Sequence, residues 1–480
     1  MTARPRFSPV IASAADHCHP NAAALVAASA PRSDALHLVG RDGDDHLFLV
    51  DGSRLFRIDS DLRIRLEQAT ANGRLAGLLA ELGLDGPPLI DDQPIADPPL
   101  HALSLAVSQA CNLGCGYCYA GQGSFGKAPR RMPLDTALAA VERLVNGAPE
   151  GGRVTLAFMG GEPLVNRPVI QAATRHAFAL AARRGVRVNG SITTNGTLVT
   201  PEDGDFFEEF GFAVTISLDG PADQHDRLRP FKDGRGSFDR IMANVAPLLK
   251  RQRRMQVSAR VTVTPDNLDL PDTLDRFIAD GFHSVGFSPL LRASAGRNVA
   301  GRNEMDGDAL LVMLDQMIAC GAAFEAAVMA GRRYPFANLV NALREIHRGT
   351  HRPYPCGAGA GYLGVSADGD LSACHRFVED EAGAMGDLTT GVDAARQAEW
   401  LRDRHVHRQE PCRSCWARYL CGGGCHHEVL GGGRTSCDYV RGWLHYCLEA
   451  YLRLSDARPD WFAGPTAGLP PGLPDATAAP

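Results

Sequence analysis

Thirteen cysteines carry most of the chemistry that this 480-residue sequence could do. Three of them, Cys111, Cys115 and Cys118, lie on one short segment with the spacing CxxxCxxC. A second group follows position 355, and four of its members have the spacing CxxCxxxxxCxxxC; the group is Cys356, Cys374, Cys412, Cys415, Cys421, Cys425 and Cys437. Cysteines two or three residues apart are typical of metal sites rather than of buried core thiols. The two groups therefore predict two metal regions.

The metal can be zinc or iron. Taken alone, the run from Cys412 to Cys425 suits a zinc ribbon as well as an iron–sulfur cluster. The first group favours iron, because three thiolates leave one iron of a four-iron cluster without a protein ligand. Such an open iron is a place to bind and cleave a small molecule.

The overall composition excludes several classes of protein. The net charge of −6 gives no basic footprint for nucleic acid or for a membrane surface. The sequence has no uninterrupted apolar run of the ~18 residues that a transmembrane helix needs, and its start does not resemble a signal peptide. We therefore predict a cytoplasmic protein with no nucleic-acid or membrane partner. In a reducing compartment the cysteines stay unpaired; Cys18 is then incidental and Cys320 belongs to the core of a helix predicted at 306–331.

Runs rich in valine, isoleucine, leucine and phenylalanine alternate with amphipathic stretches after position 100. The runs predict strands at 103–108, 154–159, 186–192, 213–218, 257–264 and 284–289. The stretches between them predict helices at 134–146, 168–184, 201–210, 237–254 and 270–280. This alternation is typical of parallel β/α units, and six units are fewer than the eight of a closed barrel. We expect an α/β fold with an open, partial (β/α)6 barrel.

Sequence motifs follow the carboxyl ends of these strands. The first cysteine segment follows the first strand, Gly160-Gly-Glu-Pro163 the second, and Thr193-Thr-Asn-Gly196 the third, while Ser217-Leu-Asp-Gly220 ends the fourth. The carboxyl edge is where β/α folds place their active sites. Each motif alone could be a turn, but four on one edge predict an active site.

The remaining segments predict smaller units around this barrel. We expect a flexible arm at 1–35, a small α+β domain of a hairpin and helices at 36–85, and a proline-rich linker at 86–100. The barrel then spans 101–340 and a cysteine-rich domain 341–455, followed by a disordered tail at 456–480. A helix is predicted at 439–454, and it carries Cys447.

The cysteine spacing of the first group together with Gly160-Gly-Glu-Pro163 resembles the radical S-adenosylmethionine (SAM) superfamily. The seven later cysteines resemble its C-terminal SPASM extension, and the hairpin region more weakly resembles the peptide-recognition domain of peptide-modifying radical enzymes. The segments Cys412-Arg-Ser-Cys-Trp-Ala-Arg-Tyr-Leu-Cys-Gly-Gly-Gly-Cys-His-His427 and Cys437-Asp-Tyr-Val-Arg-Gly-Trp443 look like the quinohemoprotein amine dehydrogenase maturation proteins.

The resemblance implies a SAM site at the barrel edge. Cys111, Cys115 and Cys118 would hold a [4Fe–4S] cluster whose open iron binds SAM. Gly160 and Gly161 would let the backbone approach the amino group of SAM, and Glu162 would accept a hydrogen bond from that ammonium. Thr194 and Ser217 would lie near the ribose or carboxylate of SAM. Tyr117 would lie near its adenine.

The resemblance also implies two auxiliary [4Fe–4S] clusters, three in all. By the family pattern one is held by Cys412, Cys415, Cys421 and Cys437, and the other by Cys356, Cys374 and Cys425. The fourth ligand of the latter is either Cys447 or an open position for a substrate thiolate. His375 stands where sulfatase-maturing relatives carry an aspartate base, so it is a candidate substrate base or a hydrogen-bonding neighbour of the cluster.

The implied function is reductive cleavage of SAM followed by thioether cross-linking. The cross-links would join cysteine sulfur to carbons of Asp or Glu side chains in a polypeptide, the small subunit of quinohemoprotein amine dehydrogenase in the narrower resemblance. The alternatives are another SPASM activity, either Ser or Cys oxidation in a sulfatase or carbon–carbon peptide linkage, and a zinc-bound peptide scaffold without redox chemistry. Expected partners are a cysteine-containing polypeptide and an electron donor such as flavodoxin or ferredoxin.

Overall fold

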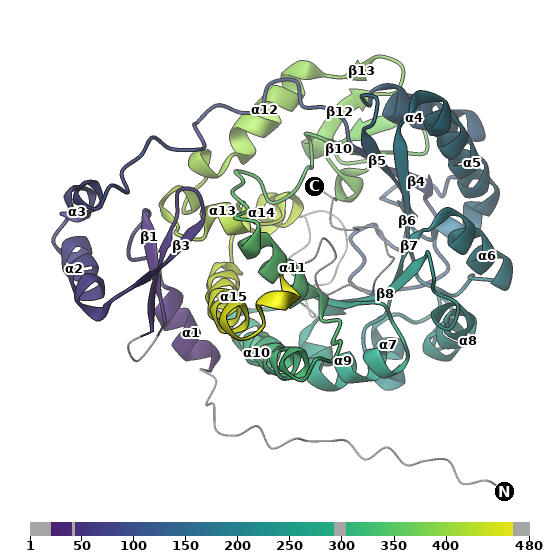
Figure 1. The fold of residues 1–480 in the computed structure, drawn as a ribbon. Coiled ribbons are helices and arrows are strands. Elements are labelled where there is room, and N and C mark those ends of the chain that lie inside the picture. The colour runs from purple at the N-terminus through teal and green to yellow at the C-terminus, as the bar shows by residue number, and fades with distance from the viewer. Residues whose placement is uncertain (1–20, 41–43, 292–303, 464–480) are drawn as a thin grey trace, which may run out of the picture.

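The strands after position 100 form one curved sheet at the centre of the molecule (Figure 1). The computed structural model describes residues 21–40, 44–291 and 304–463. Six neighbouring strands of the sheet run parallel, and they confirm the six predicted from sequence: β4 Ala102–Ser108, β5 Arg153–Gly160, β6 Arg187–Thr194, β7 Ala213–Ser217, β8 Gln256–Val263 and β9 Val285–Pro289. The expected partial α/β barrel is therefore present.

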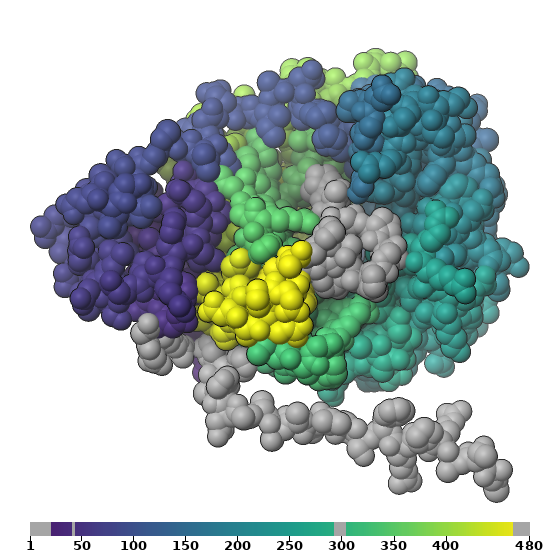
Figure 2. Space-filling model, viewed as in Figure 1, coloured from purple at the N-terminus to yellow at the C-terminus, as the bar shows by residue number. Residues whose placement is uncertain are grey.

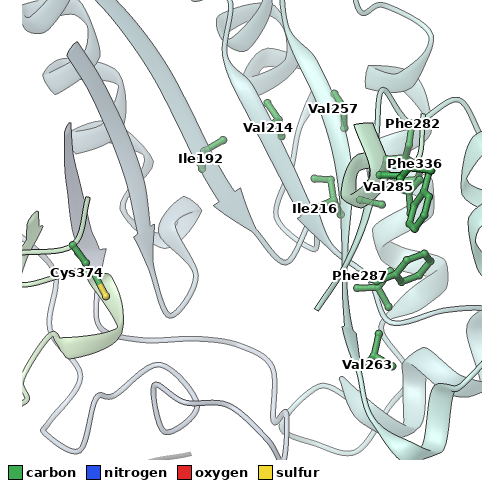
Figure 3. Close-up of a cluster of buried hydrophobic side chains, with 14 of the residues drawn as sticks. Ile192, Val214, Ile216, Val257, Val263, Phe282, Val285, Phe287, Phe336 and Cys374 are labelled. Atoms are coloured by element: carbon green, nitrogen blue, oxygen red, sulfur yellow. The ribbon is translucent and has the colours of Figure 1, made fainter. Parts of the chain in front are cut away.

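The helices between these strands cover the outer, convex face of the sheet (Figure 1). They are α4 Leu134–Asn146, α5 Arg167–Arg184, α6 Pro201–Phe210, α7 Ala222–Leu228, α8 Phe238–Leu249 and α9 Leu270–Ala279. Alternate strand residues such as Ile192, Val214 and Val257 are buried in this outer layer (Figure 3). The period of two in a strand turns the intervening residues toward the concave face, which leaves that face lined by small and polar side chains.

The cysteine-rich region continues the same sheet, which the sequence did not predict. Strand β10 Tyr362–Val365 pairs in parallel with β4, and β11 Asp370–Ser372, β12 Ala384–Asp387 and β13 Gly391–Val392 follow in antiparallel order. Its helices are α11 Ala337–His347, α12 Ala394–Arg404, α13 Arg418–Cys421, α14 His426–Gly432 and α15 Cys437–Ala457. Because β10 lies beside β4, the loops after these two strands are neighbours.

The N-terminal region forms a separate three-stranded antiparallel sheet. The predicted hairpin is confirmed by β2 Asp45–Leu49 and β3 Arg54–Ile58, and a further strand, β1 Leu36–Val39, pairs with β2. Helices α2 Ser60–Ala71 and α3 Leu75–Glu81 cover one face of it. This purple-to-blue unit packs beside the yellow α15 in Figure 2, where α15 contacts β1.

Two predicted flexible segments are in part ordered. Helix α1 Ala22–Ser29 lies within the predicted arm, yet Leu25 is buried and the Trp416 indole nitrogen donates to the Ser29 carbonyl at 2.8 Å. Helix α15 ends at Ala457, inside the tail predicted at 456–480. Phe462, which follows the helix in that tail, is buried. The hydrophobic faces of these segments pack against the rest of the chain, so the prediction of disorder was wrong there. The rest of the arm up to residue 20, with Cys18, and residues 464–480 lie outside the described residues.

Helix α10 Gly307–Met329 is long and apolar enough to cross a membrane by length and composition. More than half of its most apolar window is buried inside the protein, where it packs against α9, α15 and α1. Its buried residues, including Leu314, Met317 and Cys320, identify it as a core helix.

Candidate active site

The first cysteine segment forms a loop directly after β4, at the carboxyl edge of the sheet. Cys115 is buried, Cys111 and Cys118 are partly buried, and each of Cys111 and Cys115 is close enough to Cys118 for like-charge interaction. Burial raises the pKa of Cys111 and raises that of Cys115 to about 12. A buried thiol of this kind ionises only beside a positive charge, and bound iron supplies one. The donor set therefore fits a cluster site.

The Gly160–Gly161 turn packs against this loop. The Gly161 N–H donates to the Ser108 carbonyl at 2.7 Å, and the Glu162 N–H donates to the Ala110 carbonyl at 2.8 Å. A Cβ on Gly160 would lie 2.2 Å from the Ser108 oxygen, and one on Gly161 would lie 2.4 Å from the Ala110 oxygen. The two glycines are thus needed for close packing between backbone segments. The sequence predicted only that they let the backbone approach SAM.

Glu162 is fully buried behind the cysteine loop. Its carboxylate accepts hydrogen bonds from the Thr194 hydroxyl at 2.7 Å, the Asn195 N–H at 2.8 Å and the Leu164 N–H at 3.0 Å. Burial raises the pKa of Glu162 to about 6, against these hydrogen bonds, which lower it. A carboxylate has about four acceptor positions, so one remains for an ammonium group. Asn195, which sequence reasoning did not single out, also donates its side-chain N–H to the Cys111 sulfur at 3.7 Å.

Tyr117 belongs to a buried ionic network. Its hydroxyl donates to the Asp219 carboxylate, which also accepts from Arg229 Nε at 2.8 Å and from the Thr262 N–H at 3.0 Å. The Arg229 guanidinium lies 5.3 Å from the centre of the Tyr117 ring. The sequence did not predict Asp219 or Arg229 as site residues, although Asp219 lies in the Ser217-Leu-Asp-Gly220 motif. Ser217 itself lies half-buried on the concave face of β7.

The seven later cysteines fall into the two predicted sets. Cys412 interacts electrostatically with Cys415, Cys421 and Cys437, beside Arg434. Cys374 interacts with Cys356 and Cys425. Burial raises the pKa of Cys412 and of Cys374 to about 12. The structure therefore brings together the members of each set, of which Cys356, Cys374 and Cys425 are distant in sequence.

The spacing of the sulfur atoms bears on the zinc alternative. Zn–S bonds of about 2.3 Å put the sulfurs of one tetrahedral site about 4 Å apart. Among the described residues, the one group of three or more Cys, His, Asp or Glu ligand atoms within 4.8 Å of one another is Asp368, Asp370 and Glu379. Arg130 pairs with Asp368 and Glu379 in that exposed group, and Lys127 pairs with Glu379. No group of three or more cysteine sulfurs among the described residues lies within this spacing of 4.8 Å.

Cys447 is not brought together with either set. It lies fully buried in the middle of α15, where burial and the Glu325 carboxylate raise its pKa well above the usual value. Tyr439 and Tyr446 interact with it. This is a core position, like that of Cys320, so the structure does not supply Cys447 as a fourth ligand.

Tyr119 and His375 lie between the two cysteine regions. Tyr119 interacts electrostatically with Cys118 of the first loop and with Cys374. We call Cys356, Cys374 and Cys425 the second set. The Tyr119 ring lies 6.0 Å from the His375 ring, and His375 Nδ1 forms a 2.7 Å hydrogen bond with the Tyr362 hydroxyl. Burial lowers the pKa of His375 to about 3, helped by Arg376 and Arg260. The observed partner of His375 is therefore a tyrosine hydroxyl, and its role as a substrate base stays a prediction.

Comparison with known proteins agrees with this geometry. Residues 105–277 match the family model described as the radical SAM superfamily. The chain is 27% identical over 364 residues to a serine-type anaerobic sulfatase-maturating enzyme of Klebsiella aerogenes, covering 73% of this chain and 85% of the relative. It is 34% identical over 161 residues to a cysteine-type enzyme of Clostridium novyi, covering 30% of this chain and 40% of the relative.

Solved structures show the same fold. The structure of native anSMEcpe with bound AdoMet and Cp18Cys peptide superposes with a TM-score of 0.61 at 20% identity, covering 75% of this chain and 99% of that one. Streptococcus suis SuiB bound to precursor peptide SuiA gives a TM-score of 0.50 at 13% identity, covering 83% and 96%. Residues 105–277 are thus similar to the radical SAM superfamily, and the similarity to sulfatase-maturating enzymes over most of the chain indicates an enzyme.

Proposed function

We propose that this protein is a radical SAM maturase that oxidises a side chain of a polypeptide substrate. The observation that carries the proposal is the position of Tyr119, which interacts with a cysteine of each region, Cys118 and Cys374. A substrate at this junction would lie between the SAM-binding loop and the second set of cysteines. The relatives named sulfatase-maturating enzymes and the peptide-bound structures of similar fold support a polypeptide substrate.

In this proposal Cys111, Cys115 and Cys118 hold the SAM-binding cluster. When bound, SAM and the reduced cluster supply a 5′-deoxyadenosyl radical that removes one hydrogen atom from the substrate. Glu162 would receive the SAM ammonium at its remaining acceptor position, and the hydrogen bonds from Thr194 and Asn195 hold its carboxylate in place. The Tyr117 hydroxyl donates a hydrogen bond to Asp219, and this bond would fix the position of the Tyr117 ring.

The seven later cysteines would hold two auxiliary clusters, which makes three clusters per chain. No fourth cysteine among the described residues joins Cys356, Cys374 and Cys425, and in this proposal the fourth position is open to a substrate thiolate. Reduction of the SAM-binding cluster needs an external one-electron donor such as flavodoxin or ferredoxin.

Two substrate reactions fit this site, and each removes two hydrogens. The first is oxidation of Ser to an aldehyde, or of Cys to a thioaldehyde that water hydrolyses to the aldehyde with release of hydrogen sulfide; the sulfatase-maturating relatives favour this reaction. The second is a thioether cross-link between Cys and an Asp or Glu side-chain carbon, as in quinohemoprotein amine dehydrogenase maturation. The resemblance of the segment from Cys412 to His427, and histidine in place of aspartate after Cys374, support the second.

Anaerobic reconstitution tests the class of enzyme. We expect about twelve irons per chain, broad absorbance near 400 nm and 5′-deoxyadenosine formation after reduction. Stoichiometric zinc with no iron would refute the proposal and favour the scaffold alternative.

A peptide assay separates the two reactions. The Cp18Cys peptide, which anSMEcpe binds, is incubated with the reduced holoenzyme in parallel with a peptide that contains both Cys and Asp. Aldehyde capture by a hydrazide on the first peptide supports Ser or Cys oxidation. A loss of two hydrogens from the second, with its thiol no longer open to alkylation, supports the thioether reaction.

A further inference from the structure

An arginine on the concave face of the barrel has no carboxylate partner within the part of the chain that the structure describes. Strand β8 alternates between buried residues such as Val257, Ala259 and Val261 and residues that face the inside of the barrel. Arg260 is among the latter, and it is exposed while its neighbours Ser258 and Thr262 are partly buried. It pairs in register with Ser217 of β7 and Gly286 of β9, which places it near the carboxyl edge where the cysteine loop lies.

The guanidinium of Arg260 faces the junction between the two cysteine regions. It donates to the Ser288 hydroxyl on the inner face of β9. The charges of Arg376, Glu428 and Cys425 act on it, and its own charge acts on His375. These residues belong to the second set of cysteines and its surroundings, so Arg260 lies across the interior of the barrel from that set.

Two guanidinium groups, those of Arg260 and Arg376, and one carboxylate, that of Glu428, lie at this junction. Arg376 already has an ion-pair partner, since its Nη1 lies 2.8 Å from a Glu428 oxygen and 3.4 Å from the Cys425 sulfur. Among the described residues, no carboxylate forms an ion pair with Arg260, so two guanidinium groups share one carboxylate. Desolvation by the surrounding protein and repulsion by the Arg376 cation lower the pKa of Arg260. Arginine nevertheless remains charged in proteins. An accessible, unpaired guanidinium in a polar interior is suited to a carboxylate ligand.

We propose that Arg260 is a specificity-determining residue that binds a carboxylate of the polypeptide substrate, an Asp or Glu side chain, inside the barrel. This inference rests on the proposed function and deepens it, because an anchored carboxylate would fix the neighbouring side-chain carbon between the SAM-binding loop and Cys425. It favours an acidic residue at or beside the modified position, as the thioether reaction requires.

The test measures the binding of two fluorescein-labelled, end-capped peptides, Gly-Cys-Gly-Gly-Asp-Gly and Gly-Cys-Gly-Gly-Asn-Gly, to the reconstituted holoenzyme with SAM. A charge-assisted hydrogen bond is worth about 1.5–3 kcal/mol, so we expect the wild type to prefer the Asp peptide by about tenfold or more. Arg260→Gln should lose the preference, while Arg260→Lys should keep part of it because the charge remains. The matched control is Arg240→Gln on the exposed surface of α8, which should keep the full preference.

The outcomes separate the inference from the proposed function. Equal binding of the two peptides by the wild type, no binding of either, or an unchanged preference in Arg260→Gln overturns the inference. If iron content and 5′-deoxyadenosine formation remain normal in the same preparations, the proposed function still stands. Absence of iron and of SAM cleavage from the wild type would instead refute the proposed function.

Discussion

The two cysteine regions of this protein are built in opposite ways. Cys111, Cys115 and Cys118 are neighbours in sequence on one loop, and a strand end places that loop. The members of the second set, Cys356, Cys374 and Cys425, come from three separate segments that the fold brings together. A local loop is specified by its spacing, whereas the later sets depend on the packing of segments far apart in the chain. The two regions should therefore respond differently to substitution.

The largest effect is expected from Cys115→Ala in the first loop. The SAM-binding cluster loses one of its three protein ligands, so formation of 5′-deoxyadenosine should be abolished and about four irons per chain should be lost. Iron analysis and chromatographic detection of 5′-deoxyadenosine check this. The control is Cys320→Ala in the core of α10, which should keep both; normal SAM cleavage by Cys115→Ala would show that this loop does not hold the catalytic cluster.

Cys425→Ala should separate the two regions functionally. We expect substrate modification to stop while SAM cleavage continues, because the first loop and its contacts with Glu162 and Asn195 do not involve this cysteine. Mass spectrometry of the peptide and 5′-deoxyadenosine measurement on the same sample check the split. An equal fall in both activities would mean that the regions act as one unit.

Gly422→Ala should disturb the cysteine sets that depend on distant contacts. Gly422 has a φ of +70°, and a Cβ there would lie 2.3 Å from the nitrogen of Pro355, next to Cys356. The left-handed backbone and the clash should lower the free energy of unfolding by about 3 kcal/mol. Urea denaturation and iron content check this, and loss of auxiliary iron with SAM cleavage retained is the expected pattern. Unchanged stability would show that this contact does not hold the segments together.

Gly161→Ala should have a smaller effect on stability but act on the first region. Its Cβ would lie 2.4 Å from the Ala110 oxygen, at a backbone conformation that other residues can adopt. We expect a loss of about 2 kcal/mol and weaker SAM binding, measured by urea denaturation and equilibrium dialysis. Gly116→Ala in the same loop is the matched control, because nothing lies within 4 Å of its added Cβ; if both variants behave alike, close packing of the turn is not what matters.

Much of the fold could be predicted because it rests on local patterns. The six parallel strands and the helices between them follow from hydrophobic periodicity, and the four motifs follow from their places at strand ends. The mixed sheet could not be predicted, because the pairing of β10 with β4 joins Tyr362 to Ala102 across most of the chain. Helix α1 was missed for a related reason, since its order depends on packing against α15.

The candidate site divides in the same way. The cysteines, Glu162 and Thr194 were predicted from motifs, whereas Asp219, Arg229 and Arg260 carry no spacing signal that would mark them as site residues. Their roles arise from partners distant in sequence, such as the Tyr117 hydroxyl for Asp219 and the junction at Cys425 for Arg260. Cys447 shows the converse, because its distance of ten residues from Cys437 suggested a ligand and its burial in α15 shows a core residue.

The sequence by itself determined which strands form the barrel and which motifs follow their carboxyl ends. Spacing and periodicity suffice for these features because they depend on neighbours within a few residues. Only the tertiary structure decided that Tyr119 joins the two regions, that Cys447 lies in the core and that Arg260 faces the space between the regions. Those features depend on contacts between distant segments, and the free energy of packing the whole chain determines such contacts.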